Sequence, residues 1–197
     1  MMGFKGLTAD MVASMGSGSK VLKAGVTYRE ESSKTGRQGW HCTENPFDCL
    51  AYFPLGVGNR HFRVEAGGSI DEDEQNRISC TEITLQEELT VRKLAGYGMM
   101  YMVQHPMRQG WQQARHCVRV LENTAEAAGP DCIAIARGPR PEVKGPEGAV
   151  LGLILEPEPG WIAAAKLFTA DGQQAGKWWT IDEERNLIEV DYEKEFG

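Results

Sequence analysis

The chain has 197 residues, of which 41% are hydrophobic and 25% charged, and its formal net charge is −7. This length suits one globular unit, or one domain with a small annex. The negative charge and the lack of a basic stripe argue against a nucleic-acid partner. The longest apolar run, AVLGLIL, is too short to span a bilayer, so we expect no membrane partner.

The first part of the chain, 1–92, is expected to form a small domain with a mixed β-sheet. Short β-like segments separated by glycines predict its strands. HFRVEAGG is the clearest of them, because apolar and polar residues alternate along it with a period of two. The predicted strands lie near 3–6, 26–30, 39–42, 61–67 and 78–85.

One short helix is predicted inside this domain, over 46–53. Asn45 precedes it and is a residue type that accepts hydrogen bonds from the free N–H groups of a first helical turn. Pro46 suits the first helical position, and Asp48 lies near the positive end of the helix dipole. The segment GWHCTENPFDCLAYF is therefore expected to run from a strand through a turn into a helix.

Helix-forming residues dominate 93–128, which is expected to be a helical segment of two helices with a break around 104–110. The segment 129–197 is expected to form a glycine-rich β annex. Glycines and prolines separate its short apolar stretches, a pattern typical of one or two coils of a β-roll. The fold class expected for the whole chain is therefore α+β, with an annex through which oligomers can form.

The end of the annex is expected to form a β-meander. Asp171-Gly172 predicts a hairpin turn, because Asp-Gly pairs adopt the tight turns that join antiparallel strands. Arg185-Asn186 marks a second turn between two further β-like stretches.

The cysteines of the chain are odd in number and widely scattered: Cys42, Cys49, Cys80, Cys117 and Cys132. Such a set favours reduced thiols over a disulfide framework. Together with the absence of a signal-peptide pattern in MMGFKGLTAD, it predicts a cytoplasmic protein. The His and Cys residues of 41–61 match no zinc-site spacing, so no metal is predicted.

Three separated motifs resemble those of a family of phage and bacterial domains of unknown function. They are GFKG at 3–6, GWHCTENPFDCLAYFP at 39–54 and RHFRVEAGGSI at 60–70. They occur in the family's order, and the resemblance covers about residues 3–90. It implies a phage-associated accessory protein, located in the host cytoplasm if phage-encoded, and it implies no particular chemistry.

A second group of segments resembles the middle of ADP-ribosyltransferase domains. A strand over 39–43, a helix that ends near Tyr52 and a strand over 62–67 follow the order found there. The strand over 79–83 takes the position that presents the catalytic glutamate in those domains. The resemblance implies a cleft between two small sheets that holds NAD or another nucleotide.

This second resemblance also implies roles for individual residues. Glu82 and His41 take the catalytic positions, with Glu82 orienting the ribose and stabilising an oxocarbenium-like transition state for ADP-ribosyl transfer or NAD cleavage. The residues that the resemblance implies for cofactor binding are Lys5, Gly6, Tyr28, Thr43 and Tyr52. In this arrangement Lys5 pairs with a pyrophosphate as a point charge, and the two tyrosines form aromatic walls.

The same residues also have purely structural explanations. Glu82 suits an exposed strand face, and His41 suits a partly buried core position with its hydrogen bonds satisfied. The alternative function is a non-catalytic, phage-encoded protein with an acidic surface that binds and inhibits a host defence factor. In that case the partner is a host protein and not a nucleotide.

Overall fold

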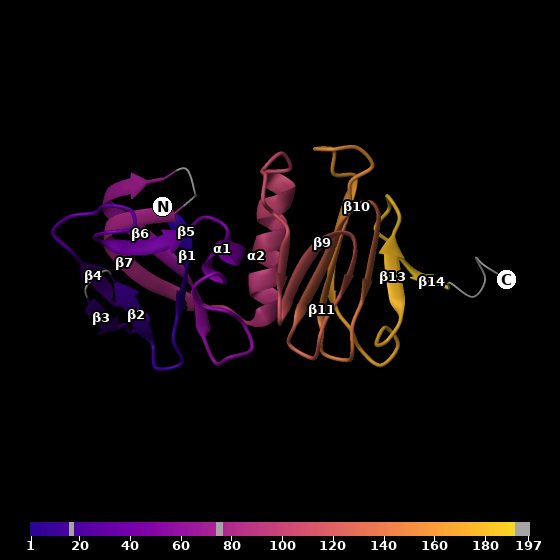
Figure 1. Cartoon of the computed structure of the whole chain (residues 1–197), viewed down its shortest axis with the longest axis horizontal. Helices are drawn as coiled ribbons and strands as arrows, with labels where there is room; N and C mark the ends of the chain where they lie inside the picture. Colours follow the sequence, from indigo (N-terminus) through magenta and orange to yellow (C-terminus); the bar gives the residue numbers. More distant parts are fainter. Residues whose placement is uncertain (16–17, 74–76, 192–197) are drawn as a thin grey trace. The chain divides into compact units, whose positions relative to one another are not determined.

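The computed structural model describes residues 1–15, 18–73 and 77–191 of the chain. About half of the protein is β-strand (50%) and little is helix (10%). The chain divides into two compact units, Met1–Thr90 and Val91–Gly197, hereafter unit 1 and unit 2. Figure 1 shows the elements of both in sequence colours.

Unit 1 contains every strand that the local patterns predict. Its elements are β1 (Met2–Leu7), β2 (Val12–Met15), β3 (Gly18–Val21), β4 (Thr27–Arg29), β5 (Trp40–Thr43), α1 (Pro46–Cys49), β6 (Arg60–Glu72) and β7 (Arg77–Glu88). β2 and β3 pair with each other in a separate two-stranded sheet. The predicted strands near 3–6, 26–30, 39–42, 61–67 and 78–85 correspond to β1, β4, β5, β6 and β7.

The main sheet of unit 1 has the strand order β4-β7-β5-β1-β6, and an additional β6–β7 pairing closes β1, β5, β7 and β6 into a ring. All of these pairings are antiparallel. The expectation of a mixed sheet was therefore wrong for unit 1. Parallel neighbours need long crossover connections, and α1, the one helix described in this unit, has only four residues.

The ring of strands encloses the core of unit 1. The buried cluster comprises Leu7, Ala13, Leu22, Trp40, Cys42, Phe62, Val64, Ala66, Ile78, Cys80, Ile83 and Leu85. Because neighbouring residues of a strand point to opposite faces, Cys42 faces this core while His41 and Thr43 face outward. Thr43 there lies opposite Phe4 of β1.

The predicted cap of α1 is confirmed, but the helix is shorter than expected. The side-chain oxygen of Asn45 accepts a hydrogen bond from the Phe47 N–H at 3.2 Å, and Pro46 occupies the first helical turn. The helix ends at Cys49 instead of continuing to residue 53. The chain then closes with one turn in which the Phe53 N–H donates to the Cys49 carbonyl at 2.9 Å.

Asn45→Ala is expected to lower the free energy of unfolding by about 1 kcal/mol, because it removes the acceptor for a helix N–H group. Asn45→Ser keeps a capping oxygen and should stay close to the wild type. Chemical denaturation of both variants measures the difference. Equal stability of the alanine and serine variants would contradict the capping role.

Unit 2 begins with the helix α2 (Val91–Gln104) and continues almost entirely as strands. These are β8 (Gln113–Arg115), β9 (Val118–Glu126), β10 (Ile133–Lys144), β11 (Val150–Leu155), β12 (Ala164–Thr169), β13 (Trp178–Ile181) and β14 (Leu187–Val190). α2 confirms the first helix expected in 93–128. The second was wrong, because β8 and β9 take its place.

The predicted helix over β9 was wrong because contacts with distant residues decide the structure of this segment. Val118 and Val120 are buried while Arg119 between them is exposed, which is a strand pattern hidden among helix-forming residues. β9 pairs along its length with β10. These ladder hydrogen bonds and buried valines outweigh a weak local helix propensity.

β9, β10 and β11 form a stack of successive coils, hereafter the β-roll; the prediction had placed the roll in 129–197 and had made the β9 segment helical. The three strands are consecutive in sequence and parallel in space, with Val118, Ile133 and Val150 in register. The short segments 127–132 and 145–149 connect them. Connections this short leave no room for a helical crossover, so the chain coils from one strand directly onto the next.

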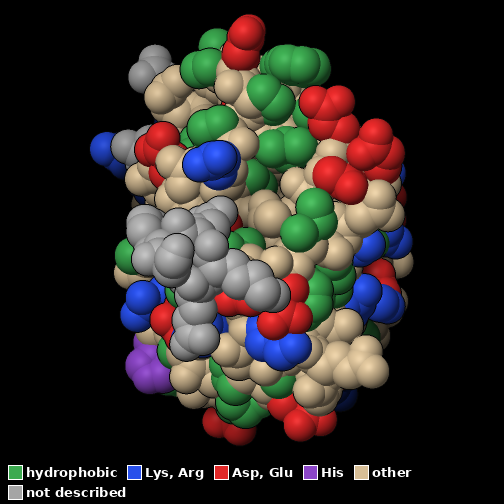
Figure 2. Space-filling view, turned by 90° about the vertical axis from the view of Figure 1, so that its right-hand side faces the viewer, with side chains coloured by type: hydrophobic (Ala, Val, Ile, Leu, Met, Phe, Trp, Pro, Cys, Tyr) green, Lys and Arg blue, Asp and Glu red, His purple; other side chains and the backbone are tan. Residues whose placement is uncertain are grey.

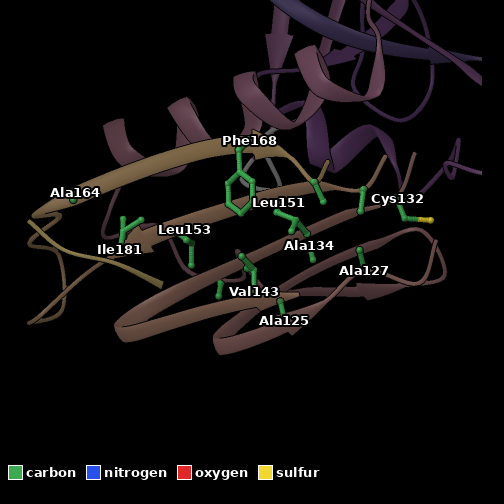
Figure 3. Packing of buried hydrophobic residues seen from close by; sticks show 13 residues of the cluster. Ala125, Ala127, Cys132, Ala134, Val143, Leu151, Leu153, Ala164, Phe168 and Ile181 are labelled. Atoms are coloured by element: carbon green, nitrogen blue, oxygen red, sulfur yellow. The ribbon is translucent and has the colours of Figure 1, made fainter. Parts of the chain in front are cut away.

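The core of the roll is built from small side chains. Alanines supply much of the buried cluster, and Figure 3 shows Phe168 of β12 pointing toward Leu151 of β11. α2 packs on β11 and β12. A side chain at Gly152 would come within 2.6 Å of the Met99 sulfur, so glycine is needed there for the close approach of the helix.

The meander of unit 2 differs in part from the expectation. β13 and β14 pair antiparallel around a turn in which Arg185 has a φ of 65°, as expected for Arg185-Asn186. The hairpin at Asp171-Gly172 was wrong, because β12 pairs with β11 whereas β13 pairs with β10 and β14. The Asp171 side chain instead accepts hydrogen bonds from the N–H groups of Gln173 and Gln174 and shapes a wider turn.

Figure 2 shows one face of the molecule, on which acidic side chains gather in one region while Lys and Arg are scattered and form no continuous basic patch. Among the described residues, no helix is both long and apolar enough to cross a membrane.

Candidate ligand pocket

A pocket of about 590 Å³ opens in unit 1 beside β1 and β5. It lies between these strands, the turn after α1 and the start of β7. The residues that line it are Phe4, Lys5, Gly6, Thr8, Ser14, Gly36, His41, Cys42, Thr43, Cys49, Tyr52, Phe53, Asn59 and Arg77. None of these described residues is acidic.

The structure brings most of the predicted site residues together. Lys5, Gly6, His41, Thr43 and Tyr52 all line this pocket. They come from β1, from β5 and from the turn that follows α1. β1 and β5 are adjacent antiparallel strands, which explains why residues nearly forty positions apart share one site.

Glu82 and Tyr28 lie elsewhere and do not line the pocket. The Glu82 carboxylate pairs with the Arg29 guanidinium at 2.9 Å, and both side chains are open to solvent (41% and 68% exposed). Tyr28 packs on Trp40, with ring centroids 5.7 Å apart. Of the predicted catalytic pair, His41 lines this pocket and Glu82 does not.

Lys5 is the most unusual residue of the pocket, because this lysine is only 6% exposed. Its Nζ donates a hydrogen bond to the His41 carbonyl at 2.7 Å. Burial lowers the pKa of this ammonium, and the ionisable groups that act in the opposite direction are the thiols of Cys42, Cys49 and Cys80. No carboxylate forms an ion pair with Lys5 among the described residues.

His41 has a structural task beside the pocket. Its Nε2 accepts a hydrogen bond from the Gly36 N–H at 2.9 Å, which holds the preceding loop in place. Burial, and then the charge of Lys5, lower the pKa of the imidazole, so it is neutral at pH 7. This arrangement agrees with the structural explanation of His41 as a partly buried histidine with satisfied hydrogen bonds.

The thiols that line the pocket are protonated. The Cys49 Sγ donates to the Phe4 carbonyl at 3.2 Å and lies 3.1 Å from the Thr43 hydroxyl. Burial raises the pKa of Cys49 to about 11. The pKa of Cys42 is also raised, first by its hydrogen bond with Cys80 and then by burial. Because the thiolate is the reactive form of cysteine, neither residue suits a nucleophile.

Gly6 explains part of the GFKG motif. A Cβ atom at this position would lie 2.5 Å from the Phe53 Cβ, so only glycine lets the turn after α1 pack on β1. The Phe53 carbonyl is in turn held by the His61 Nε2 at 2.8 Å. Gly6 thus positions the aromatic wall of the pocket, which differs from the direct cofactor contact that the resemblance implies.

Gly6→Ala is expected to lower the free energy of unfolding by about 1–3 kcal/mol, because the added methyl group overlaps the Phe53 side chain. Gly67→Ala is the matched control, since a Cβ there meets nothing closer than 3.8 Å. Thermal melts followed by circular dichroism compare the two. Similar midpoints for both alanine variants would show that Phe53 moves freely and does not fix this wall.

Sequence reasoning missed Arg77 and Phe53. Arg77 is opposite Thr43 in the β5–β7 pairing, and its guanidinium pairs with Asp73 at 2.6 Å. Hydrogen bonds with Asp73 and then Tyr52 raise its pKa. No local pattern marks Arg77, because only the pairing of distant strands places it in the pocket.

A metal centre finds no support in the part of the chain that the structure describes. His, Cys, Asp and Glu side chains do not gather there in groups of three that would hold an ion. The groups that line the pocket are the side chains of Lys5 and Arg77, hydroxyl and amide groups, and aromatic rings.

Comparison with known proteins agrees with the first of the two resemblances at a general level. Searches of curated proteins and of solved structures each found no match. Residues 1–97 match the family described as "Domain of unknown function (DUF7666)". The domain that carries the pocket is thus similar throughout to a family of domains of unknown function.

Proposed function

We propose that unit 1 is a binding domain for a small phosphate-bearing ligand of nucleotide size, with NAD as the first candidate. The observation that supports this proposal most strongly is the burial of Lys5. Lys5 is one of the residues that line the pocket, its ammonium is buried, and the hydrogen bond described for it is to a backbone carbonyl.

The energetics of burial favour an anionic ligand. Taking an ammonium out of water costs several kcal/mol unless an opposite charge compensates it. Burial and hydrogen bonding keep Cys42 and Cys49 protonated, and the carbonyl of His41 carries only a dipole. The pKa of Cys80 is lowered, first by its hydrogen bond with Cys42, so this thiol is the one described group that can partly compensate the ammonium. A phosphate group in the pocket would supply the opposite charge and accept the remaining N–H groups of Lys5.

The rest of the lining suits the same class of ligand. No acidic side chain among the described lining residues would repel a phosphate, although the chain as a whole has a net charge of −7. Arg77 adds a second cation, and Tyr52 and Phe53 add aromatic surface on which a base can stack. A volume of about 590 Å³ is within the usual range for small-molecule sites.

The geometry favours binding over ADP-ribosyl transfer. Transfer needs a carboxylate beside the ribose to stabilise positive charge as the glycosidic bond breaks. Glu82 is paired with Arg29 at an exposed position and does not line the pocket. We therefore place NAD in the pocket as a ligand and not as a substrate.

Isothermal titration with NAD, ADP-ribose and inorganic pyrophosphate tests this proposal. We expect Lys5→Met to weaken binding about tenfold to a hundredfold, the usual loss for one charged hydrogen bond. Lys23→Met is the matched control, because Lys23 is an exposed lysine of the same unit. It should bind like the wild type, and so should Glu82→Gln.

Two results would contradict the proposal. If none of the three probes binds the wild type, a phosphate-bearing ligand of this pocket is ruled out. Consumption of NAD by the wild type but not by Glu82→Gln, followed by proton NMR, would restore the transferase interpretation and make Glu82 catalytic.

A further inference from the structure

Unit 2 contains a pair of thiols that the pocket does not involve. The sulfur atoms of Cys117 and Cys132 are 2.7 Å apart, closer than van der Waals contact between two sulfurs. Cys132 is buried at one end of the core cluster of the roll, as Figure 3 shows. Cys117 is partly exposed and packs against the same cluster.

The backbone explains why the two thiols meet. Cys117 immediately precedes β9 and Cys132 immediately precedes β10, two parallel strands in which Val118 and Ile133 are partners. The Ile133 N–H donates to the Cys117 carbonyl at 2.8 Å, so the pairing extends to the cysteines themselves. Neighbouring strands are about 4.8 Å apart, which is within the Cα separation that a disulfide spans.

The two thiols differ in their surroundings. Burial, and then the hydrogen bond with Cys117, raise the pKa of Cys132 to about 12, so it is protonated. Cys117 has an exposed histidine as its neighbour, and the His116 Nδ1 lies 3.4 Å from the Cys117 sulfur. The imidazole is thus a base beside the sulfur of the pair that small molecules can reach.

We propose that Cys117 and Cys132 form a reversible disulfide that joins two successive coils of the β-roll, with a small-molecule disulfide as the oxidant. The Cys117 thiolate attacks one sulfur of the oxidant, forms a mixed disulfide and releases one thiol. Cys132 then loses its proton and attacks the Cys117 sulfur, which releases the second thiol. The protein loses two electrons and two protons, and one small disulfide becomes two thiols.

The cysteines of unit 1 include a second hydrogen-bonded thiol pair, Cys42 and Cys80, but both of its members are buried. Cys42, Cys49 and Cys80 are all buried, and Cys49 is held by hydrogen bonds to Phe4 and Thr43. None of them has an exposed histidine beside its sulfur among the described contacts. They therefore serve as internal controls, since the same oxidant should leave them as thiols.

Incubation of the full chain with oxidised glutathione tests the proposal. After unfolding and alkylation, intact mass spectrometry should show two fewer alkylated thiols than in the dithiothreitol-treated protein, and peptide mapping should find Cys117 linked to Cys132. Dithiothreitol should reverse the change. The cross-link closes the loop from Cys117 to Cys132, which restricts the unfolded chain. It should therefore raise the thermal midpoint by about 5–10 °C.

Cys117→Ser provides the matched control, because it keeps the size of a half-exposed side chain and removes one partner. Its thermal midpoint should be the same with and without oxidised glutathione. Full alkylation of the oxidised wild type, a lasting glutathione adduct on Cys117 with Cys132 still free, or a dimer linked through Cys117 would each overturn the proposal.

Discussion

Arg137→Met is expected to lower the free energy of unfolding of unit 2 by about 3–5 kcal/mol, the usual cost of removing one partner from a buried ion pair. Arg137 lies in β10 with its side chain 2% exposed, and Glu156, just after β11, has a side chain 11% exposed. Two guanidinium nitrogens donate to the two carboxylate oxygens of Glu156, each at 2.6 Å.

This ion pair also ties three segments of unit 2 together. The Arg137 Nη2 donates to the Pro106 carbonyl, which follows α2, at 2.5 Å. Glu156 accepts the Gly160 N–H at 2.7 Å, and the guanidinium stacks over the Trp111 ring at 5.0 Å. Methionine fills a similar volume but leaves the Glu156 carboxylate buried without its partner.

The matched control is the double variant Arg137→Met/Glu156→Leu, which removes both charges. It should recover most of the lost stability, because an apolar pair of similar volume carries no desolvation cost. Urea denaturation of the single and double variants measures this. If the double variant is as unstable as Arg137→Met, packing and not the unpaired carboxylate causes the loss.

The ion pair between Arg137 and Glu156 also makes the stability of unit 2 depend on pH. Burial raises the pKa of Glu156, but the hydrogen bonds from Arg137 and Gly160 outweigh it, so the pKa is below its ordinary value of 4.5. The stabilisation is therefore complete above pH 4.5 and is lost as the pH falls through the folded pKa. Glu156→Gln should remove this part of the acid sensitivity.

Lys5→Met should have the opposite effect on unit 1 and raise the free energy of unfolding by about 1–3 kcal/mol. The charge of Lys5 is buried without a carboxylate partner among the described residues, so methionine removes a desolvation cost that exceeds the loss of one hydrogen bond. Lys23→Met, at an exposed position, should change stability by less than about 0.5 kcal/mol.

The pH dependence distinguishes this cause from simple packing. The pKa of Lys5 in the folded protein is below 10.5, its ordinary value. Between these two values the unfolded chain binds a proton that the folded chain does not, so wild-type stability rises with pH across that window. The gain in Lys5→Met should shrink there as the pH rises. A constant gain at every pH, or a less stable variant, would show that the charge carries no cost.

A residue that costs stability and also lines a pocket is usually kept for function. Loss of binding together with gain of stability in Lys5→Met would thus support the proposed function from two directions. Loss of both would indicate a structural lysine.

The sequence by itself determined most of the local structure of unit 1. Alternating apolar residues predicted β6, and glycine punctuation predicted β1 and β5, because a period of two and tight turns are local properties of the chain. The cap at Asn45 was predictable for the same reason. In unit 2, glycines and prolines at short intervals indicated the coils of the β-roll, whose turns again need particular residues.

Only the tertiary structure decided which faces of these elements meet. Cys80 and Ile83 of β7 are both buried, which a regular period of two cannot produce. The pairing of β6 with β7 is irregular between Gly67 and Ile70, opposite this part of β7. Alternation could therefore not place Glu82, which lies outside the pocket.

The burial of Lys5, the strand β9 and the meeting of Cys117 with Cys132 were likewise beyond local patterns. Each depends on residues that are distant in sequence: β1, which carries Lys5, pairs with β5 and β6, and β10 supplies the ladder that makes β9 a strand. The free energy of these contacts comes from long-range pairing and burial. It can exceed the propensity of a short segment, and the segment alone does not reveal it.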